Sequence, residues 1–499
     1  MKPSLTFGKV RSVLWPVYRH EAKTVVPMLL LFFFLTLAYD LLRPLKVSMV
    51  VQGSSAGFEV IPFLKVWVML PGAVALTWVY TKLAARMSME KVFYAILSIF
   101  CLFYMCFLTF LYPNRELLAL DGLASWLTQI LPIGARGLIA VVRDWPLSIF
   151  YAITELWGAL VLTVLMWGYA NEVTDVEHAQ RFYGLFAMGS NIAAVVAGYI
   201  GATFSTVDYN PYLPGNNAWE QTIHYIIATG MLACIFSAVL FRYINVYVYP
   251  DKVVAAPKSK KKKLGLVDCF KQVSASPYLL LLAALVLGYN LSFNLADIVW
   301  NREVHRYFSN DPAGFNKFMS HVTSATGVIS TIMALLVTSN LLRLKGWTVT
   351  ALMTPVVVFF TGGIFFALLL VDNSNIFGVN EMIFGIPIAT VLLAVGAVQM
   401  CFTRALKYTV FDATKEIAYI PLSREERQNG KAAIDGIGSR LGKSGGSLLF
   451  QLLLVSLSSF DAVLPFIGVV FMFVVSLWGG AVIRLGRLIP GSATPSHKS

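Results

Sequence analysis

Twelve long apolar runs are the feature that most constrains the fold of this chain. A helix that crosses a bilayer needs roughly 20 mainly apolar residues, whereas membrane strands show a shorter, alternating pattern. The chain of 499 residues is 57% hydrophobic and 13% charged, with a mean hydropathy of +0.70, so most of it has lipid as its solvent. We predict an all-α polytopic membrane protein whose twelve transmembrane helices cover about 25–42, 60–80, 92–112, 147–170, 182–203, 222–248, 278–298, 322–342, 348–371, 382–403, 432–456 and 462–483.

The distribution of basic residues predicts the orientation of these spans. Lysines and arginines concentrate in alternate loops, including the run KSKKKK, and the loops STVDYNPYLPGNNAWEQ, VDNSNIFGVNE and SSFD contain neither residue. The positive-inside rule assigns the basic loops to the cytoplasm, and an even number of spans then assigns both termini to it. The net charge of +13 is therefore explained by topology, and we expect no nucleic-acid partner.

A basic, proline-containing stretch divides the spans into two groups of six. This layout is typical of transporters built from two repeats, as in the major facilitator fold, and here both repeats enter the membrane in the same orientation. We predict a cytoplasmic leader 1–24, an N-terminal six-helix half 25–248, a basic cytoplasmic linker 249–276, a C-terminal six-helix half 277–484 and a disordered cytoplasmic tail 485–499. The apolar segment 120–143 is interrupted by Pro132 and Gly134, and we predict an amphipathic helix on the outer surface there.

Motif spacing argues against an enzyme. The stretch GIGSRLGKSGG, residues 436–446, looks like a P-loop, but the position that requires its first glycine is Ile437. No set of magnesium ligands accompanies it, so we expect no ATP hydrolysis. The five cysteines form no Cys-x-x-Cys pair and no histidines cluster, so we expect neither a metal nor a cofactor.

Charged residues inside the predicted spans mark a candidate binding site. A charge at a helix centre costs about 2.5–3.5 kcal/mol on insertion scales, so each one needs a partner or a cavity. A cavity with several cations and two acids suits a polyanionic substrate, because cations neutralise phosphates and the acids pair with them when the substrate is gone. The alternative for each residue is a structural ion pair or a snorkelling side chain, above all for Arg43 and Lys65. The candidates are Arg43, Lys46, Arg440, Lys443 and the adjacent Ser444 for phosphates, Glu155 and Asp297 as the acids, and Lys65 as a further cation.

Four aromatic side chains in these spans are candidates for stacking on a nucleotide base. They are Phe58, Trp67, Tyr151 and Phe293. Ordinary core packing is the alternative role for each of them.

Several long segments resemble the ATP/ADP translocases of intracellular bacteria and plant plastids. They include FGKVRSVLWPVYRHE, EVIPFLKVWVMLPGAV, AITELWGALVLTVLMWGYANEVTDVEHAQRFYGLF and KYTVFDATKEIAYIPLSREERQNGKAAIDGIGSRLGKSGGS. The similarity runs nearly end to end, and the leader looks most like the chlamydial members. The resemblance implies import of host nucleotides across a bacterial inner membrane by alternating access.

The resemblance also assigns roles to individual residues. Arg43 and Lys46 match the first-span Arg-x-x-Lys, Glu155 the glutamate of Glu-Leu-Trp-Gly, and Lys443 the lysine of Gly-Lys-Ser-Gly-Gly. Two positions depart from the family. Its Lys-Asp-Thr reads Lys46-Val47-Ser48 here, and the glutamate of its Asn-Leu-Val-Glu pattern is Asp297.

These departures affect the acids that couple exchange, so they favour proton-coupled net uptake over strict ATP/ADP exchange. The expected partners are ATP, ADP, other nucleotides such as GTP, UTP, CTP or NAD, protons and the lipid bilayer. A different organic anion as substrate and a nucleotide sensor without transport remain alternatives.

Overall fold

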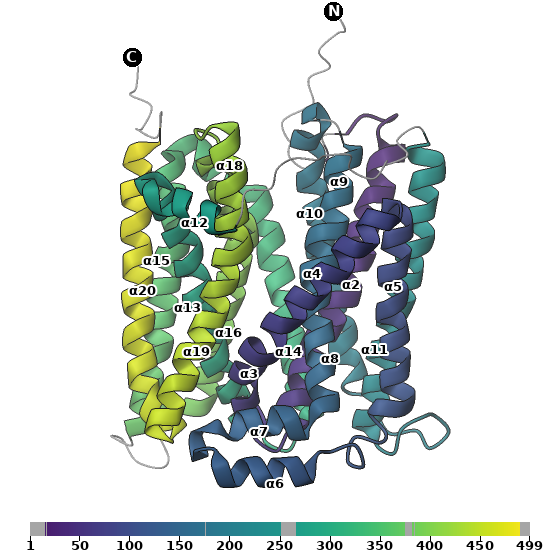
Figure 1. The fold of residues 1–499 in the computed structure, drawn as a ribbon, viewed down its shortest axis with the longest axis vertical. Helices are drawn as coiled ribbons and strands as arrows, with labels where there is room; N and C mark the ends of the chain where they lie inside the picture. The colour runs from purple at the N-terminus through teal and green to yellow at the C-terminus, as the bar shows by residue number, and fades with distance from the viewer. Residues whose placement is uncertain are drawn as a thin grey trace, which may run out of the picture.

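Long helices make up almost all of the computed structural model, which describes residues 15, 17–174, 176–250, 266–374, 382–383 and 385–489 (Figure 1). The strands among these residues are β1 (Met382–Ile383) and β2 (Ile386–Pro387), which have two residues each and pair antiparallel. The predicted all-α fold class is therefore confirmed. The first helices are α2 (Ala22–Gly53), α3 (Val60–Phe63), α4 (Met69–Arg86), α5 (Met89–Cys106), α6 (Asp121–Ile130), α7 (Arg136–Arg143), α8 (Trp145–Trp157), α9 (Trp167–Val173), α10 (Val176–Phe204) and α11 (Ala218–Tyr243). They are followed by α12 (Leu266–Ala275), α13 (Pro277–Tyr307), α14 (Pro312–Ile332), α15 (Ser339–Ser374), α16 (Ile388–Leu406), α17 (Asp412–Ala418), α18 (Arg424–Lys431), α19 (Ser439–Leu457) and α20 (Phe460–Leu488).

Eleven helices in the described part of the chain are long and apolar enough to cross a membrane. They coincide with eleven of the twelve predicted spans. The predicted span 432–456 is not among them, because α19 begins with Arg440, Lys443 and three glycines and is much less apolar than its neighbours. Figure 1 shows α19 among the helices of the C-terminal half, where it packs against α13 and α20. The total of twelve spans stays a prediction.

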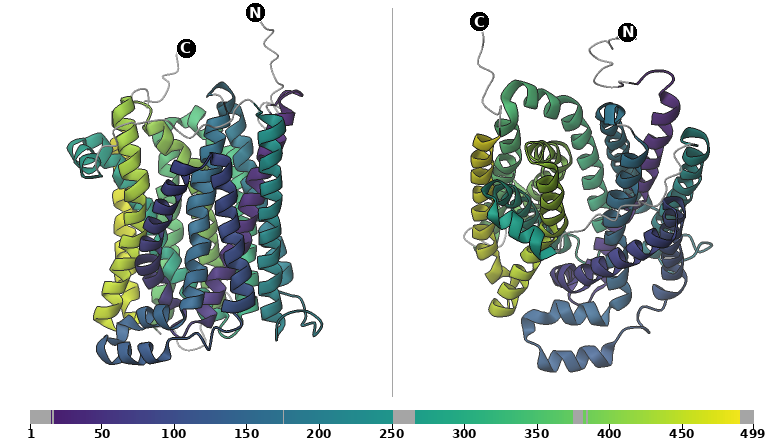
Figure 2. Two further views of the ribbon diagram at one scale, coloured as in Figure 1. Left: turned by 45° about the vertical axis from the view of Figure 1, so that its right-hand side comes forward. Right: turned by 45° about the horizontal axis from the view of Figure 1, so that its top comes forward.

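The helices are arranged in two groups, which we call the N-terminal half (α2–α11) and the C-terminal half (α13–α20). In the N-terminal half α2 packs against α8, α10 and α11, and in the C-terminal half α13 packs against α16, α19 and α20 (Figures 1 and 2). The predicted boundaries 25–248 and 277–484 stay predictions. In the predicted linker, residues 266–275 form α12 and residues 251–265 lie outside the described residues, as do most of the predicted leader and residues 490–499 of the predicted tail.

Two short helices cover one end of the bundle. α2 begins and α20 ends at one end of the bundle, and α6 and α7 lie across the other end (Figure 1). They replace the single amphipathic helix predicted over 120–143, because Pro132 has an extended backbone (φ −65°, ψ 158°) and separates them. Neither is among the membrane-length helices, which agrees with the absence of a thirteenth span there.

One turn within the membrane-length helices depends on a glycine. Gly346 has a φ of +74° and interrupts α15, at the place where the sequence predicts the loop between spans 322–342 and 348–371. An L-residue with a side chain rarely adopts this conformation. The interruption therefore marks the end of one span and the start of the next.

The two halves are packed most closely along α10 and α14. A Cβ atom at Gly198 would lie 2.3 Å from the backbone oxygen of Ser320, and one at Gly327 would lie 2.7 Å from the backbone oxygen of Asn191. The hydroxyl of Ser324 donates a hydrogen bond of 2.8 Å to the carbonyl of Val195. Small residues thus bring the two backbones together, as they do in other membrane helix pairs.

Further contacts join the halves at the end covered by α6 and α7. Ser48 and Gln52, at the end of α2, donate hydrogen bonds of 2.9 Å to the carbonyls of Pro312 and Phe308. Gln451 of α19 donates one of 2.8 Å to the carbonyl of Pro62, and Gly134 packs against the backbone of α19 at Leu454. At the other end, ion pairs such as Arg181–Glu21 and Lys415–Asp435 link helices of the same half.

The close approach of α10 to α14 can be tested with one methyl group. Gly198→Ala should destabilise the protein by roughly 1–3 kcal/mol, because the new Cβ has no room beside the α14 backbone. The expected result is a lower melting temperature in detergent. Gly184→Ala is the matched control, since α10 has open space around Gly184. Equal melting temperatures for the two variants would contradict the packing described here.

Candidate functional site

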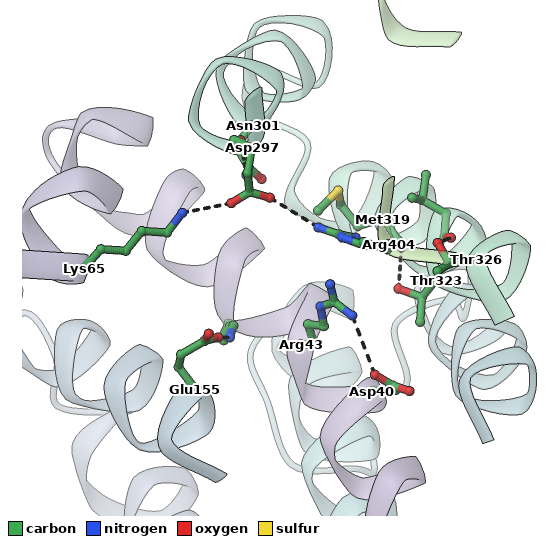
Figure 3. A network of polar contacts seen from close by, with 12 residues as sticks. Asp40, Arg43, Lys65, Glu155, Asp297, Asn301, Met319, Thr323, Thr326 and Arg404 are labelled. Atoms are coloured by element: carbon green, nitrogen blue, oxygen red, sulfur yellow. Dashed lines mark hydrogen bonds and ion pairs between the residues drawn. The ribbon is translucent and has the colours of Figure 1, made fainter. Parts of the chain in front are cut away.

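A cluster of charged side chains lies between the two halves, in the interior of the membrane-length helices (Figure 3). We call it the central cluster. Its members come from five membrane-length helices and from α19, which lie far apart in the sequence. They are Asp40, Arg43 and Lys46 of α2, Lys65, Glu155 of α8, Asp297 of α13, Arg404 of α16 and Lys443 of α19.

Lys46 and Glu155 form an ion pair within the N-terminal half. The ammonium group of Lys46 donates a hydrogen bond to the carboxylate of Glu155 and lies 5.0 Å from the ring centre of Tyr151 and 5.6 Å from that of Tyr39. Lys46 is only 2% exposed, whereas the Glu155 side chain is 35% exposed. The ammonium group of Lys46 is therefore buried, whereas the carboxylate side of the pair, Glu155, is accessible.

Asp297 connects the two halves through a bridge of three residues. One carboxylate oxygen of Asp297 lies 2.9 Å from Nζ of Lys65 in the N-terminal half, and the other lies 3.2 Å from Nη2 of Arg404 in its own half (Figure 3). Arg404 is buried, and its Nε has no hydrogen-bond partner in the described part of the chain. Its guanidinium lies 5.6 Å from the ring centre of Phe293.

Lys443 completes the cluster from α19. Its side chain is exposed, and it interacts electrostatically with Glu155, Lys407 and Lys65. Lys443 and Lys46, from different halves, therefore act on the same carboxylate. Lys407 itself is paired with Asp412 at 3.2 Å.

Two of the glycines around Lys443 serve packing, whereas Gly445 has open space around it. Gly442 and Gly446 lie against α13, where a Cβ would meet Asn290 at 2.8 Å and Leu291 at 3.0 Å. The π-helical segment Ala432–Gly438 runs into α19 without a break, since Gly438 has helical φ and ψ. The backbone N–H groups of this stretch lie inside a continuous helix, so they are not presented to a phosphate.

Local helix geometry helps to direct these side chains inward. Asp40, Arg43 and Lys46 are spaced by three residues, which places them on one face of α2. Lys65 lies within the π-helical segment Leu64–Val68. Glu155 and Arg404 each precede a π-helical segment, Gly158–Met166 and Lys407–Phe411 respectively. Such wide turns change the direction of neighbouring side chains and occur often at functional sites.

The cluster carries an excess of positive charge. The five cations Arg43, Lys46, Lys65, Arg404 and Lys443 face the three carboxylates Asp40, Glu155 and Asp297. Because charge in the membrane interior is costly, an arrangement with two unmatched cations is best stabilised by an anion. The accessible surface on Glu155 and Lys443 gives such an anion a way in.

Only part of the predicted set is brought together. Arg43, Lys46, Lys65, Glu155, Asp297 and Lys443 meet in the central cluster, where the rings of Tyr151 and Phe293 lie beside cations. The described contacts of the remaining predicted residues do not reach it. Arg440 is exposed one turn before Lys443, and Ser444 has no hydrogen bond in the described part. Trp67 donates to Gln451 at 3.1 Å, and Phe58 packs on Phe460 and His305 near the covered end.

A sequence model described as the TLC ATP/ADP transporter matches residues 1–488. The chain belongs to the TLC ATP/ADP transporter family. The predicted resemblance is thereby confirmed over nearly the whole chain, and the protein is a multi-pass membrane transporter and not an enzyme.

Relatives within the TLC ATP/ADP transporter family come from bacteria and plastids. The chain is 38% identical to ADP,ATP carrier protein 1 of Chlamydia muridarum over 489 residues, which covers 97% of this chain and 91% of the relative. It is 34% identical to the chloroplastic ADP,ATP carrier protein 1 of Arabidopsis thaliana, covering 93% and 73% of the two chains. It is 31% identical to ADP,ATP carrier protein 3 of Rickettsia prowazekii, covering 98% of each.

Solved transporter structures share the fold. A bacterial homologue of the iron transporter ferroportin superposes with a TM-score of 0.55 at 13% identity and covers 94% of this chain and 99% of its own. The nucleoside transporter NupG gives a TM-score of 0.54 at 12% identity, with coverage of 92% and 99%. At these identities the likeness concerns the fold alone, and it confirms the major-facilitator-like architecture of this family member.

Sequence reasoning missed two members of the cluster. The predicted span 382–403 ends one residue before Arg404, but this residue lies within α16 and is 6% exposed. Asp40 was overlooked, although its spacing from Arg43 and Lys46 places it on the same helix face. That spacing is the signal that could have identified Asp40. No local pattern distinguishes Arg404 from the cations that follow it, such as Lys407 and Lys415.

The buried ion pair can be tested by removing one charge. Glu155→Gln leaves the buried ammonium of Lys46 without its anion, and we expect a loss of about 3 kcal/mol of stability, at the lower end for a buried pair because Glu155 is partly accessible. Thermal unfolding in detergent measures this loss. Asp121→Asn, which breaks an exposed pair with Arg143, should cost less than about 1 kcal/mol. Similar losses in both variants would contradict the structural role of the Lys46–Glu155 pair.

Proposed function

We propose that this chain imports nucleoside triphosphates, ATP first among them, across a bacterial inner membrane by alternating access, with protons driving net uptake. The observation that carries the proposal is the positive excess of the central cluster, to which both halves contribute. Cations from two moving bodies can hold one polyphosphate, and the cargo then links binding to movement. Membership in the ATP/ADP transporter family supports the choice of a nucleotide as the cargo.

In this proposal Glu155 and Asp297 bind the cations of the central cluster when no nucleotide phosphate is present. In the empty protein Glu155 holds Lys46, and Asp297 holds Lys65 and Arg404. Phosphate oxygens accept strong, charge-assisted hydrogen bonds from the same cations and displace the carboxylates. Because the Lys65–Asp297 pair joins the halves, its release by the nucleotide frees one half to move relative to the other. Arg43, Arg440, Lys443 and Ser444 are further proposed phosphate contacts.

Tyr151 and Phe293 are the strongest candidates for stacking on the base. Each ring lies beside a cation of the cluster, so a base stacked there would leave its phosphates among the cations. Trp67 and Phe58 are occupied by contacts near the covered end, and they would become available only if that end opens.

The direction of opening follows from the contacts between the halves. Hydrogen bonds from Ser48, Gln52 and Gln451 hold the halves together at the end covered by α6 and α7. The positive-inside rule assigns the opposite end, where α2 begins and α20 finishes, to the cytoplasm. We therefore propose that both termini are cytoplasmic and that the described conformation is closed toward the outside.

Strict ATP/ADP exchange is the second candidate. The curated relatives in Chlamydia, Rickettsia and Arabidopsis are named ADP,ATP carriers, which favours it. Val47 in place of an acid, and Asp297 in place of a glutamate, favour net uptake instead. Uptake of labelled ATP in proteoliposomes, with and without internal nucleotide, separates the two. A competition panel of GTP, UTP, CTP, ADP and NAD defines the range of substrates, and an absence of any counterflow would indicate a sensor.

Lys443 provides the direct test of the phosphate site. Lys443→Ala should reduce ATP uptake by at least about tenfold, because a charge-assisted hydrogen bond contributes roughly 1.5–3 kcal/mol. Lys443→Arg should retain part of the activity. Initial uptake rates in proteoliposomes, corrected for the amount of folded protein, measure the effect. Lys82→Ala is the control, since Lys82 packs on Trp78 away from the cluster. Uptake at the wild-type rate by the alanine variant would reject the assignment.

Proton coupling predicts a response to pH. An acidic exterior should accelerate uptake of ATP into vesicles that contain no nucleotide, and a protonophore should suppress this acceleration. The measurement is the initial rate at equal and unequal pH on the two sides. If neither treatment changes the rate, and if internal nucleotide is strictly required, exchange is the better description.

A further inference from the structure

The three carboxylates of the central cluster have unequal partners. Glu155 accepts a hydrogen bond from Lys46 and interacts with Lys443 as well. Asp297 is bound by Lys65 at 2.9 Å and by Arg404 at 3.2 Å. Asp40 has only Arg43, at 3.9 Å, and it accepts no hydrogen bond within the described part of the chain. Asp40 is therefore the least compensated acid of the three.

Asp40 is also the most deeply buried of the three carboxylates. It is 6% exposed and lies one helical turn before Arg43, between α2 and the C-terminal half (Figure 3). The charged groups that act on it are Arg43 of its own helix and Arg404 of α16. α8, α10, α11 and α14 also pack against α2, but their described residues present no ionised side chain to Asp40.

The two arginines near Asp40 come from different halves. Arg43 and Arg404 repel each other electrostatically, and the carboxylates of Asp40 and Asp297 balance them in the empty protein. A polyphosphate that binds between the two guanidinium groups would draw Arg43 away from Asp40. Asp40 would then be a buried carboxylate without a partner, which is strongly unfavourable unless it takes up a proton.

We infer that Asp40 is the site that binds the coupling proton, and that it takes up this proton when Arg43 turns to the phosphates of the nucleotide. The inference rests on the proposed function and adds to it the group that carries the proton. The proton on Asp40 and the nucleotide are then carried across the membrane in the same step. On release of the nucleotide, Arg43 returns to Asp40 and the proton leaves. Nucleotide and proton thus bind together, which is the requirement for symport.

The first experiment measures proton uptake directly. Purified wild-type protein in detergent, in a weakly buffered solution with a pH indicator, is mixed with ATP previously adjusted to the same pH. We expect uptake of about one proton for each nucleotide bound, because the two binding events are linked. Asp40→Asn, which keeps the shape but cannot ionise, should bind ATP without this uptake. Asp40→Glu should restore it, and the exposed Asp121→Asn should behave as the wild type.

The second experiment follows transport. Asp40→Asn should lose the acceleration by an acidic exterior, whereas the control Asp121→Asn should keep both this acceleration and the counterflow of labelled ATP against internal nucleotide. A wild-type protein that binds ATP without taking up a proton overturns the inference, whether or not Asp40→Asn folds. So does an Asp40→Asn variant that still responds to the pH gradient. If the wild type shows no counterflow at all, the proposed nucleotide transport itself fails, and that outcome is distinct from both of these.

Discussion

The structure depends on one constraint, which is that charged side chains inside the membrane-length helices need partners of opposite charge. Some of these partners come from the other half of the molecule. The bridge from Lys65 through Asp297 to Arg404 crosses from one half to the other, with separations of 2.9 and 3.2 Å. In this cluster each half has one more cation than carboxylates, so a bound anion is needed to balance all of the charges. Because an uncompensated charge in this environment is costly, the state of the cluster and the relative position of the halves are tied to each other.

The contacts between the halves are of two kinds, and a moving transporter needs both. Along α10 and α14 the backbones meet at glycines, over a long and tightly packed surface that a small movement can use as a pivot. At the covered end the halves meet through a few hydrogen bonds, such as those from Ser48 and Gln52, and through the packing of Gly134 on α19. Contacts of this second kind can be broken and remade at modest cost, as a gate requires.

Much of the fold was predictable from local sequence properties. Eleven of the twelve spans predicted from hydropathy coincide with membrane-length helices. Pro132, which interrupts the apolar segment 120–143, correctly indicated that no span lies there. The failed P-loop spacing at Ile437 argued against an enzyme, in agreement with the transporter family. The sequence does not reveal that Gly442 and Gly446 lie on the face of α19 that packs on α13. The predicted span 382–403 excluded Arg404 for a related reason, since hydropathy does not reveal that the helix continues past Leu406 to Ala418.

The sequence by itself determined the class of protein, the positions of most spans and three of the charges that meet in the central cluster, Lys46, Glu155 and Lys443. These depend on composition, periodicity and motifs, all of which are local. The tertiary structure alone decided which charges are partners, because Lys65, Asp297 and Arg404 lie on helices separated by more than a hundred residues and meet only through packing. It also decided that Asp40 has the weakest compensation, since that depends on how far each cation can reach once the helices are in contact.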